Sequence, residues 1–164
     1  MTMTLQEIGR IYTPFRTLAA CPRNGRQIQP APDCTVLVDP AWLGALAGLE
    51  GISHLVLLYW LGPQAATTTV TPSFDGQPRG VFATRSPARP NPIGLSIVEL
   101  VSVEGGTLTV RNLDCLDGTP LLDIKPYLPS TDSEPDATMG WLAPHRTPRV
   151  TGVKGVTGVT GVPA

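Results

Sequence analysis

The stretch LSIVELVSVEGGTLTVRNL, residues 95–113, holds two runs rich in β-branched and aliphatic residues, separated by a pair of glycines. Residues 95–103 and 107–113 each have the composition of a β-strand. Glycines permit the positive φ angles that a tight turn between antiparallel strands requires. The segment 104–106, Glu-Gly-Gly, therefore predicts a hairpin that joins the two runs.

Short strands of the same kind are predicted along most of the chain before this hairpin. Residues 55–61 are apolar throughout, which favours a central strand that is buried on both faces. One short helix is predicted at 40–47, where Asp39 can act as the N-cap and Pro40 fits the first position. The other strand candidates are 7–13, 34–38, 53–61, 67–71 and 80–85.

The distribution of proline and glycine limits the fold class. The 18 prolines and 17 glycines divide the sequence into short pieces and exclude long helices. Strands and helical patterns do not alternate, and no G-x-G-x-x-G motif follows a strand, so a Rossmann fold is not expected. Many short strands with little helix predict an all-β protein, either a β-barrel or a β-sandwich.

The length of 164 residues fits one domain, which we place at 1–142. From about residue 131 the sequence becomes polar and rich in proline. Residues 143–164 form a low-complexity tail of glycine, valine and threonine, predicted to be flexible or to add an edge strand.

The net charge of −1 provides no general attraction for nucleic acid, so any such partner must be bound by a local basic patch. No apolar run is long enough to span a membrane and no secretory signal is present, which predicts a cytoplasmic protein with no membrane partner. The three cysteines lack the spacing of a zinc site, and no metal is expected. His54 is predicted to be structural, because no G-x-S-x-G motif supports a catalytic triad.

The segment RSPARPNPIG, residues 85–94, is stiff and basic. Proline fixes φ and lacks an N–H donor, so the segment is predicted to be an irregular, preorganised loop. Arg85 and Arg89 can bind a carboxylate or phosphate, and Asn91 offers both a donor and an acceptor. The alternative is a rigid corner of the barrel whose arginines are only solvated.

Two further segments carry polar side chains suited to a ligand. In LDCLDGTPLLDIKPYLP, residues 113–129, Asp114 and Asp117 can accept hydrogen bonds from ribose hydroxyls or an amine, although Asp-Gly is also ordinary turn chemistry. Asp123 and Lys125 lie on one face if the segment is extended, where they can pair with each other or with an arginine of the proline-rich loop. The segment CPRNGRQ, residues 21–27, forms a basic loop.

These segments together resemble the TsaA-like (TrmO) family of S-adenosylmethionine-dependent methyltransferases. The resemblance runs from about residue 5 to 141 and is carried by GVFATRSPARPNPIGLSIVEL (80–100) followed by LDGTPLLDIKPYLP (116–129). It implies a single-sheet β-barrel and a homodimer that holds S-adenosylmethionine near the subunit interface. It also implies methylation of the exocyclic nitrogen of threonylcarbamoyl-adenosine beside the tRNA anticodon, without a metal.

The resemblance also implies the residues of the site. Asp117 is the anion expected to steady the sulfonium or accept the amine proton. Arg89, Asn91 and Lys125 are expected to contact the substrate. The cofactor contacts would be Pro22, Arg23, Asn24, Arg85, Leu95, Asp114, Cys115, Leu116 and Asp117.

Two departures from the family pattern leave other functions open. Where the family has a histidine after the buried strand, this chain has Gly62, and it lacks the second domain of longer members. Both departures, with the near-neutral charge, favour a small-molecule substrate. Gly62 also leaves open a catalytically silent cofactor-binding module. tRNA binding would rest on cations gathered on one face of a dimer, namely Arg16, Arg23, Arg26, Arg79, Arg85, Arg89 and Lys125.

Overall fold

The computed structural model describes residues 4–62, 68–73 and 75–145. The chain divides into two compact units, Met1–Ser133 and Glu134–Ala164. Of the second unit, the described part contains the short 3₁₀ helix η3 (Gly140–His145). The predicted C-terminal tail lies outside the described residues from position 146 onward.

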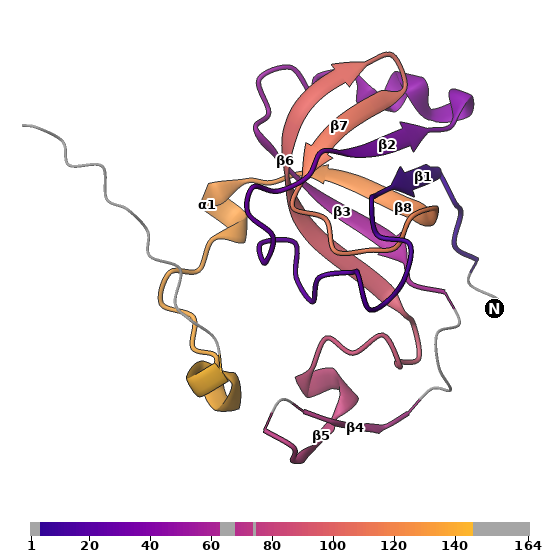
Figure 1. The fold of residues 1–164 in the computed structure, drawn as a ribbon. Coiled ribbons are helices and arrows are strands. Elements are labelled where there is room, and N and C mark those ends of the chain that lie inside the picture. Colours follow the sequence, from indigo (N-terminus) through magenta and orange to yellow (C-terminus); the bar gives the residue numbers. More distant parts are fainter. Residues whose placement is uncertain (1–3, 63–67, 74, 146–164) are drawn as a thin grey trace, which may run out of the picture. The chain divides into compact units, whose positions relative to one another are not determined.

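Six antiparallel strands of the first unit form one closed barrel (Figure 1). The order around the barrel is β1-β2-β7-β6-β3-β8, and the pairing of β1 with β8 closes the sheet. The all-β prediction is confirmed, and of its two alternatives the barrel is the one formed. The strands are β1 (Gly9–Tyr12), β2 (Cys34–Val38), β3 (His54–Trp60), β6 (Ile93–Glu104), β7 (Thr107–Arg111) and β8 (Thr119–Pro126).

The predicted glycine hairpin joins β6 to β7. Glu104 pairs with Thr107, so Gly105 and Gly106 form the two-residue turn. Gly105 has a φ of 59°, in the left-handed region that an L side chain rarely adopts. The hairpin prediction from the sequence is confirmed.

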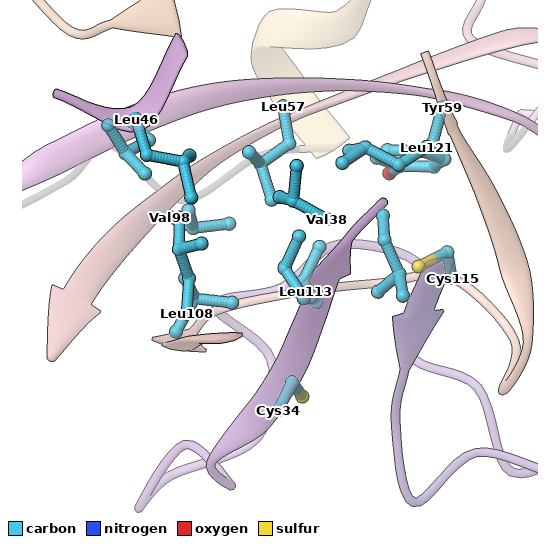
Figure 2. Packing of buried hydrophobic residues seen from close by; sticks show 14 residues of the cluster. Cys34, Val38, Leu46, Leu57, Tyr59, Val98, Leu108, Leu113, Cys115 and Leu121 are labelled. Atoms are coloured by element: carbon cyan, nitrogen blue, oxygen red, sulfur yellow. The ribbon is translucent and has the colours of Figure 1, made fainter. Parts of the chain in front are cut away.

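The core fills the inside of the barrel with side chains from all six strands (Figure 2). On β3 the inward residues Leu55, Leu57 and Tyr59 are buried, whereas the outward residues are only half-buried. The prediction that this strand is buried on both faces is therefore wrong. The reason is that β3 belongs to a closed barrel, so only one of its two faces points into the core, although the other face is also largely apolar.

The helix predicted at 40–47 is a 3₁₀ helix, η1 (Pro40–Leu46). The Asp39 side chain makes no capping hydrogen bond, so that detail of the prediction is wrong. Its backbone carbonyl instead accepts a hydrogen bond from the amide of Trp42, 2.9 Å away. This i to i+3 bond is the pattern of a 3₁₀ turn.

The strand predicted at 80–85 is also wrong. A small separate sheet pairs β4 (Val70–Pro72) with β5 (Pro78–Gly80), and the chain then turns into the 3₁₀ helix η2 (Val81–Ala83). The amide of Thr84 closes this turn on the carbonyl of Val81. A four-residue helix, α1 (Pro129–Asp132), follows β8.

Strand β8 is the main element that sequence reasoning missed. It pairs with both β1 and β3 and so completes the barrel. Its register shifts between Leu121 and Asp123, leaving Leu122 as an extra residue. The bulge breaks the alternation that identifies a strand, and Pro120 and Pro126 further disguise it.

No helix among the described residues combines the length and apolar character needed to cross a membrane.

Candidate functional site

All three ligand-binding segments predicted from the sequence emerge at the same end of the barrel. Strands β1, β3 and β7 finish there, and β2, β6 and β8 begin there, as the pairing of Trp60 with Ile93 and of Ile11 with Thr119 shows. We call this the loop end. The loop containing 21–27 joins β1 to β2, the loop containing 85–92 joins β3 to β6, and residues 112–118 join β7 to β8.

A compact polar cluster lies at the loop end, formed by Tyr59 of β3, Ser96 of β6 and Asp114. The hydroxyl groups of Tyr59 and Ser96 lie 2.7 Å and 2.6 Å from the Oδ1 of Asp114, and 2.7 Å from each other. Each hydroxyl group has one proton to donate and the carboxylate can only accept, so at most two of the three contacts are hydrogen bonds at any one time. The Oδ2 of Asp114 has no hydrogen-bond partner within the described residues.

Tyr59 is held as a neutral donor in this cluster. Burial, and secondly the charge of Asp114, raise the pKa of its phenol far above the usual value. Gly94 lies directly beneath the ring, where an added Cβ would stand 2.1 Å from a ring carbon. The close approach fixes the ring, so that its hydroxyl group points at the carboxylate of Asp114.

Asp117 lies in the same segment but already binds protein groups through both oxygens. Its Oδ1 accepts from the amide of Thr13 at 3.1 Å, and its Oδ2 lies 3.3 Å from a guanidinium nitrogen of Arg16. The Thr13 hydroxyl donates to the carbonyl of Cys115 at 2.9 Å. These bonds tie the end of β1 to residues 115–117.

The loop at 21–27 is organised by its own hydrogen bonds and packs beside Asp114. The Asn24 side chain accepts from the amide of Arg26, and the Gln27 side chain accepts from the amide of Arg23. Gly25 lies against the backbone of Asn112, so close that an added Cβ would stand 1.7 Å from the Asn112 carbonyl oxygen. This loop therefore lies against Asn112, at the start of the segment that carries Asp114 and Asp117.

The Gly25→Ala variant tests this packing. A methyl group cannot fit against the Asn112 backbone, so the loop must move away from residues 112–114. We expect a loss of about 1–3 kcal/mol in the free energy of unfolding, measured by urea denaturation. Gly44→Ala is the control, because an added Cβ there meets nothing within 4 Å and should cost little. Equal effects in both variants would contradict the close packing.

The proline-rich loop is rigid, and its two arginines differ. The guanidinium group of Arg89 donates to the carbonyls of Thr84 and Ser86, at 3.2 Å and 3.4 Å, and so braces the loop. Arg85 is exposed and makes no hydrogen bond or ion pair with any described residue. Arg85 is therefore available for a ligand, whereas Arg89 is not merely solvated, as the alternative for this loop supposed, but holds the loop in shape.

The remaining predicted residues are placed around the loop end or away from it. Pro22 is half-buried, and Asn91 is exposed. Leu95 is 44% exposed and faces outward from β6, opposite to the inward side chain of Ser96. Cys115 is buried, and Leu116 is half-buried.

Lys125 lies towards the other end of the barrel, where its strand β8 finishes. It pairs with Asp123 at 2.7 Å on the outer face, as the extended spacing predicted. The same end holds an apolar cavity of about 300 Å³ between η1 and the barrel, lined by residues such as Leu46, Leu49 and Ile124. Its lining is mostly apolar but includes Asp123, and none of its lining residues is a cation for a carboxylate, so the site suited to a charged cofactor is the loop end. His54 lies at the same end of the barrel as this cavity, opposite to the loop end, with its Nδ1 2.9 Å from the Ser53 hydroxyl.

Sequence reasoning did not single out Tyr59 and Ser96. The signal was present: a tyrosine closes an otherwise aliphatic run at 55–59, and a serine takes an inward position between Gly94 and Val98. Polar groups at inward positions of a barrel need a partner, which here is Asp114.

The chemistry of the loop end fits S-adenosylmethionine. Arg85 offers a guanidinium group that no described residue occupies, suited to a carboxylate, and the Oδ2 of Asp114 offers an acceptor for a hydroxyl or amino group. No cluster of three or more metal-ligating side chains occurs in the part of the chain that the structure describes.

Comparisons with known proteins agree with this assignment. Residues 10–133 match the tRNA-methyltransferase O N-terminal domain. A probable S-adenosyl-L-methionine-binding protein, VirR of Rhizobium radiobacter, is 46% identical over 73% of this chain and 67% of its own. The tRNA (adenine(37)-N6)-methyltransferase of Escherichia coli is 40% identical over 83% of this chain and 62% of its own.

A solved structure shares the fold as well as the sequence. The crystal structure of TrmO from Pseudomonas aeruginosa superposes with a TM-score of 0.72 at 39% identity, covering 85% of this chain and 62% of the other. The chain thus spans a little over three fifths of the methyltransferases that it matches. Because the domain match covers most of the barrel and the relatives exceed 30% identity, the chain belongs to the TrmO family.

Proposed function

We propose that this protein is an S-adenosylmethionine-dependent N-methyltransferase that acts on adenosine in tRNA. The observation that carries the proposal is the Tyr59–Ser96–Asp114 cluster at the loop end, which holds one carboxylate oxygen without a partner among the described residues. Two relatives, named above, are called an S-adenosyl-L-methionine-binding protein and a tRNA (adenine(37)-N6)-methyltransferase, and support the cofactor and the substrate class.

Different residues of the loop end would bind different parts of the cofactor. Arg85 would bind the cofactor carboxylate, and the Oδ2 of Asp114 would accept from a ribose hydroxyl or from the amine of either ligand. Leu95 would lie against the apolar methionine chain, and the 21–27 loop with Pro22, Arg23 and Asn24 would close over the cofactor. When bound, the cofactor supplies a methyl group on a sulfonium, which is already a strong electrophile.

The protein's part in the reaction is orientation. Holding an acceptor nitrogen in line with a methyl group supplies much of the rate acceleration that a methyl transfer needs. Asp114 is better suited than Asp117 to receive the amine proton, because Asp117 already accepts from Thr13 and pairs with Arg16. Asp117 then serves to hold residues 114–117 in position.

For the substrate we propose the exocyclic nitrogen of threonylcarbamoyl-adenosine beside the anticodon. Incubation of tRNA with the protein and labelled S-adenosylmethionine, followed by mass spectrometry of the nucleosides, tests the proposal. Label in a modified adenosine supports it. Cofactor binding without transfer to any tRNA nucleoside would contradict the substrate.

A small-molecule substrate is the second candidate, and Gly62 is the observation that favours it. Gly62 has a φ of 73° and open space where a side chain would project, so it presents only backbone at the end of β3. Any contact that a histidine makes there in other members of the family is absent from this position. Transfer of label to a small amine, with none to tRNA, would select this candidate.

We also propose that the protein is a homodimer. The outer face of β6 near the loop end exposes Ile93 and Leu95, at 38% and 44%. Adjacent apolar side chains on an exposed sheet face are typical of a subunit interface. Sedimentation velocity should give a dimer mass, and a monomer at micromolar concentration would contradict this proposal.

The Arg85→Ala variant should lose cofactor affinity. Charge-assisted hydrogen bonds contribute about 1.5–3 kcal/mol, so we expect the dissociation constant to rise by about 10- to 150-fold in calorimetry. Lys125→Ala is the matched control, because this cation lies towards the other end of the barrel and pairs with Asp123. Unchanged affinity in Arg85→Ala would remove Arg85 from the site.

A further inference from the structure

Phe82 is an aromatic side chain that the protein displays in solvent. At 79% exposure it is the most exposed of the large apolar side chains in the described part of the chain. It lies in the middle of the 3₁₀ helix η2, between buried Val81 and exposed Ala83. Single exposed apolar side chains are common on protein surfaces, so the role of this ring must be argued from the segment that carries it and from its surroundings.

The segment that carries Phe82 is held rigidly. The buried side chain of Val81 anchors it, and the Val81 amide donates to the carbonyl of Thr69 at 3.0 Å. The hydroxyl of Thr84 donates to the Val81 carbonyl at 2.9 Å, and Arg89 braces the following turn. The ring is therefore presented at little conformational cost, as a preformed binding element would be.

The surroundings of Phe82 are basic, although the chain as a whole is not. Residues 68–94 contain three arginines against a single aspartate, a net charge of +2, whereas the full chain has a net charge of −1. Asp75 pairs with Arg79 at 2.7 Å, and Arg85 is left without a protein partner among the described residues. The positive charge is thus concentrated on the segment that displays the aromatic ring.

This segment is attached beside the Tyr59–Ser96–Asp114 cluster. It leaves β3 after Trp60 and enters β6 at Ile93, and the amide of Leu61 donates to the carbonyl of Pro92 at 2.8 Å where the two strands meet. Figure 1 shows β4 and β5 projecting from the end of the barrel at which β3 finishes. Phe82 and Arg85 are three residues apart on this projection.

We propose that Phe82 is a stacking platform for an unpaired nucleobase of the RNA substrate, beside the cofactor that Arg85 binds. This inference rests on the proposed function and names a residue that positions its substrate. Proteins that bind single-stranded RNA combine basic surfaces with isolated aromatic rings on which bases stack. A protein interface would instead require a contiguous apolar core. Among residues 83–89, which follow Phe82, the only large side chains are those of two arginines.

The test is the binding of a fluorescein-labelled anticodon stem–loop RNA, read by anisotropy, to the full chain and its variants. A stacked base contributes enough that Phe82→Ala should weaken RNA binding by about 5- to 150-fold. Phe82→Trp should retain binding, and Phe82→Leu, which keeps the apolar character without the π face, should not. Val103→Ala is the control, because it removes an exposed apolar side chain at the far end of β6 and should change nothing.

Three further measurements separate the outcomes. Calorimetry should show unchanged cofactor affinity in Phe82→Ala, and kinetics should show a higher KM for RNA. If Phe82→Ala is monomeric while the unmodified chain is dimeric, Phe82 is a subunit contact and the inference is overturned. Equal RNA binding by Phe82→Ala and the unmodified chain overturns it as well. If RNA binding depends on Phe82 but no methyl is transferred, the stacking role stands and the proposed activity fails.

Discussion

Asp114→Asn should reduce cofactor affinity and methyl transfer by at least about 30-fold, the largest loss expected from one side chain at the site. The substitution keeps the shape of the side chain and can still accept one hydrogen bond from Tyr59 or Ser96. It removes the negative charge and replaces one acceptor oxygen with a donor. Asp114 is half-buried, but its partners Tyr59 and Ser96 are buried. Loss of one partner from a hydrogen-bonded charge contact in such a cluster costs about 2–5 kcal/mol, which corresponds to a loss in affinity of about 30-fold or more.

Asp117→Asn is the matched control for this prediction. The asparagine Oδ1 can still accept from the Thr13 amide, so only the pair with Arg16 is lost, and Arg16 is 80% exposed. Exposed ion pairs contribute little, and we expect nearly unchanged binding in calorimetry. If Asp117→Asn abolishes binding while Asp114→Asn does not, Asp117 is the functional anion and our assignment is reversed.

The sequence predicted the barrel well where local rules apply. The glycine hairpin and the strand at 34–38 follow from turn chemistry and composition, and both are present with nearly the expected bounds. Strand β8 could not be predicted, because its bulge at Leu122 arises from the pairing with β3, a strand more than 60 residues earlier in the chain. No local pattern encodes that pairing, although without it the barrel cannot close.

For the site, too, local sequence patterns predict the segments but not the contacts between residues far apart in the chain. The three segments that meet at the loop end could be selected from their residue types, because charged and amide side chains in stiff loops suit ligands. The choice between Asp114 and Asp117 could not be made, since it depends on which carboxylate the fold has already bound. Thr13 and Arg16, about 100 residues earlier, occupy Asp117, whereas one oxygen of Asp114 has no partner in the part of the chain that the structure describes.

The second large effect concerns alkaline pH, at which the free energy of unfolding should fall steeply. Burial raises the pKa of the Cys34 thiol to about 11, with a smaller contribution from the charge of Asp33, and burial also raises the pKa values of Cys115 and Tyr59. In the unfolded chain cysteine titrates near pH 8.5–9 and tyrosine near 10. Between these values and the folded ones, the unfolded chain releases protons that the folded chain keeps. Stability is therefore full below about pH 8.5 and is lost as the pH rises.

Each such group contributes at most about 1.4 kcal/mol per pH unit. At pH 10.5 the two cysteines are about 1.5–2 units above their unfolded pKa and the tyrosine about 0.5 unit above, so the three together should lower the free energy of unfolding by about 5–6 kcal/mol. That is a large fraction of the stability of a domain this size. Urea denaturation between pH 7 and 10.5 measures the slope, and Cys34→Ala should make it shallower whatever its effect at pH 7. Replacing the exposed Tyr12 by phenylalanine is the control and should leave the slope unchanged. A flat profile in the unmodified chain would mean that the loop-end hydroxyl and both thiols reach solvent in the folded protein, and the closed packing around Asp114 would have to be abandoned.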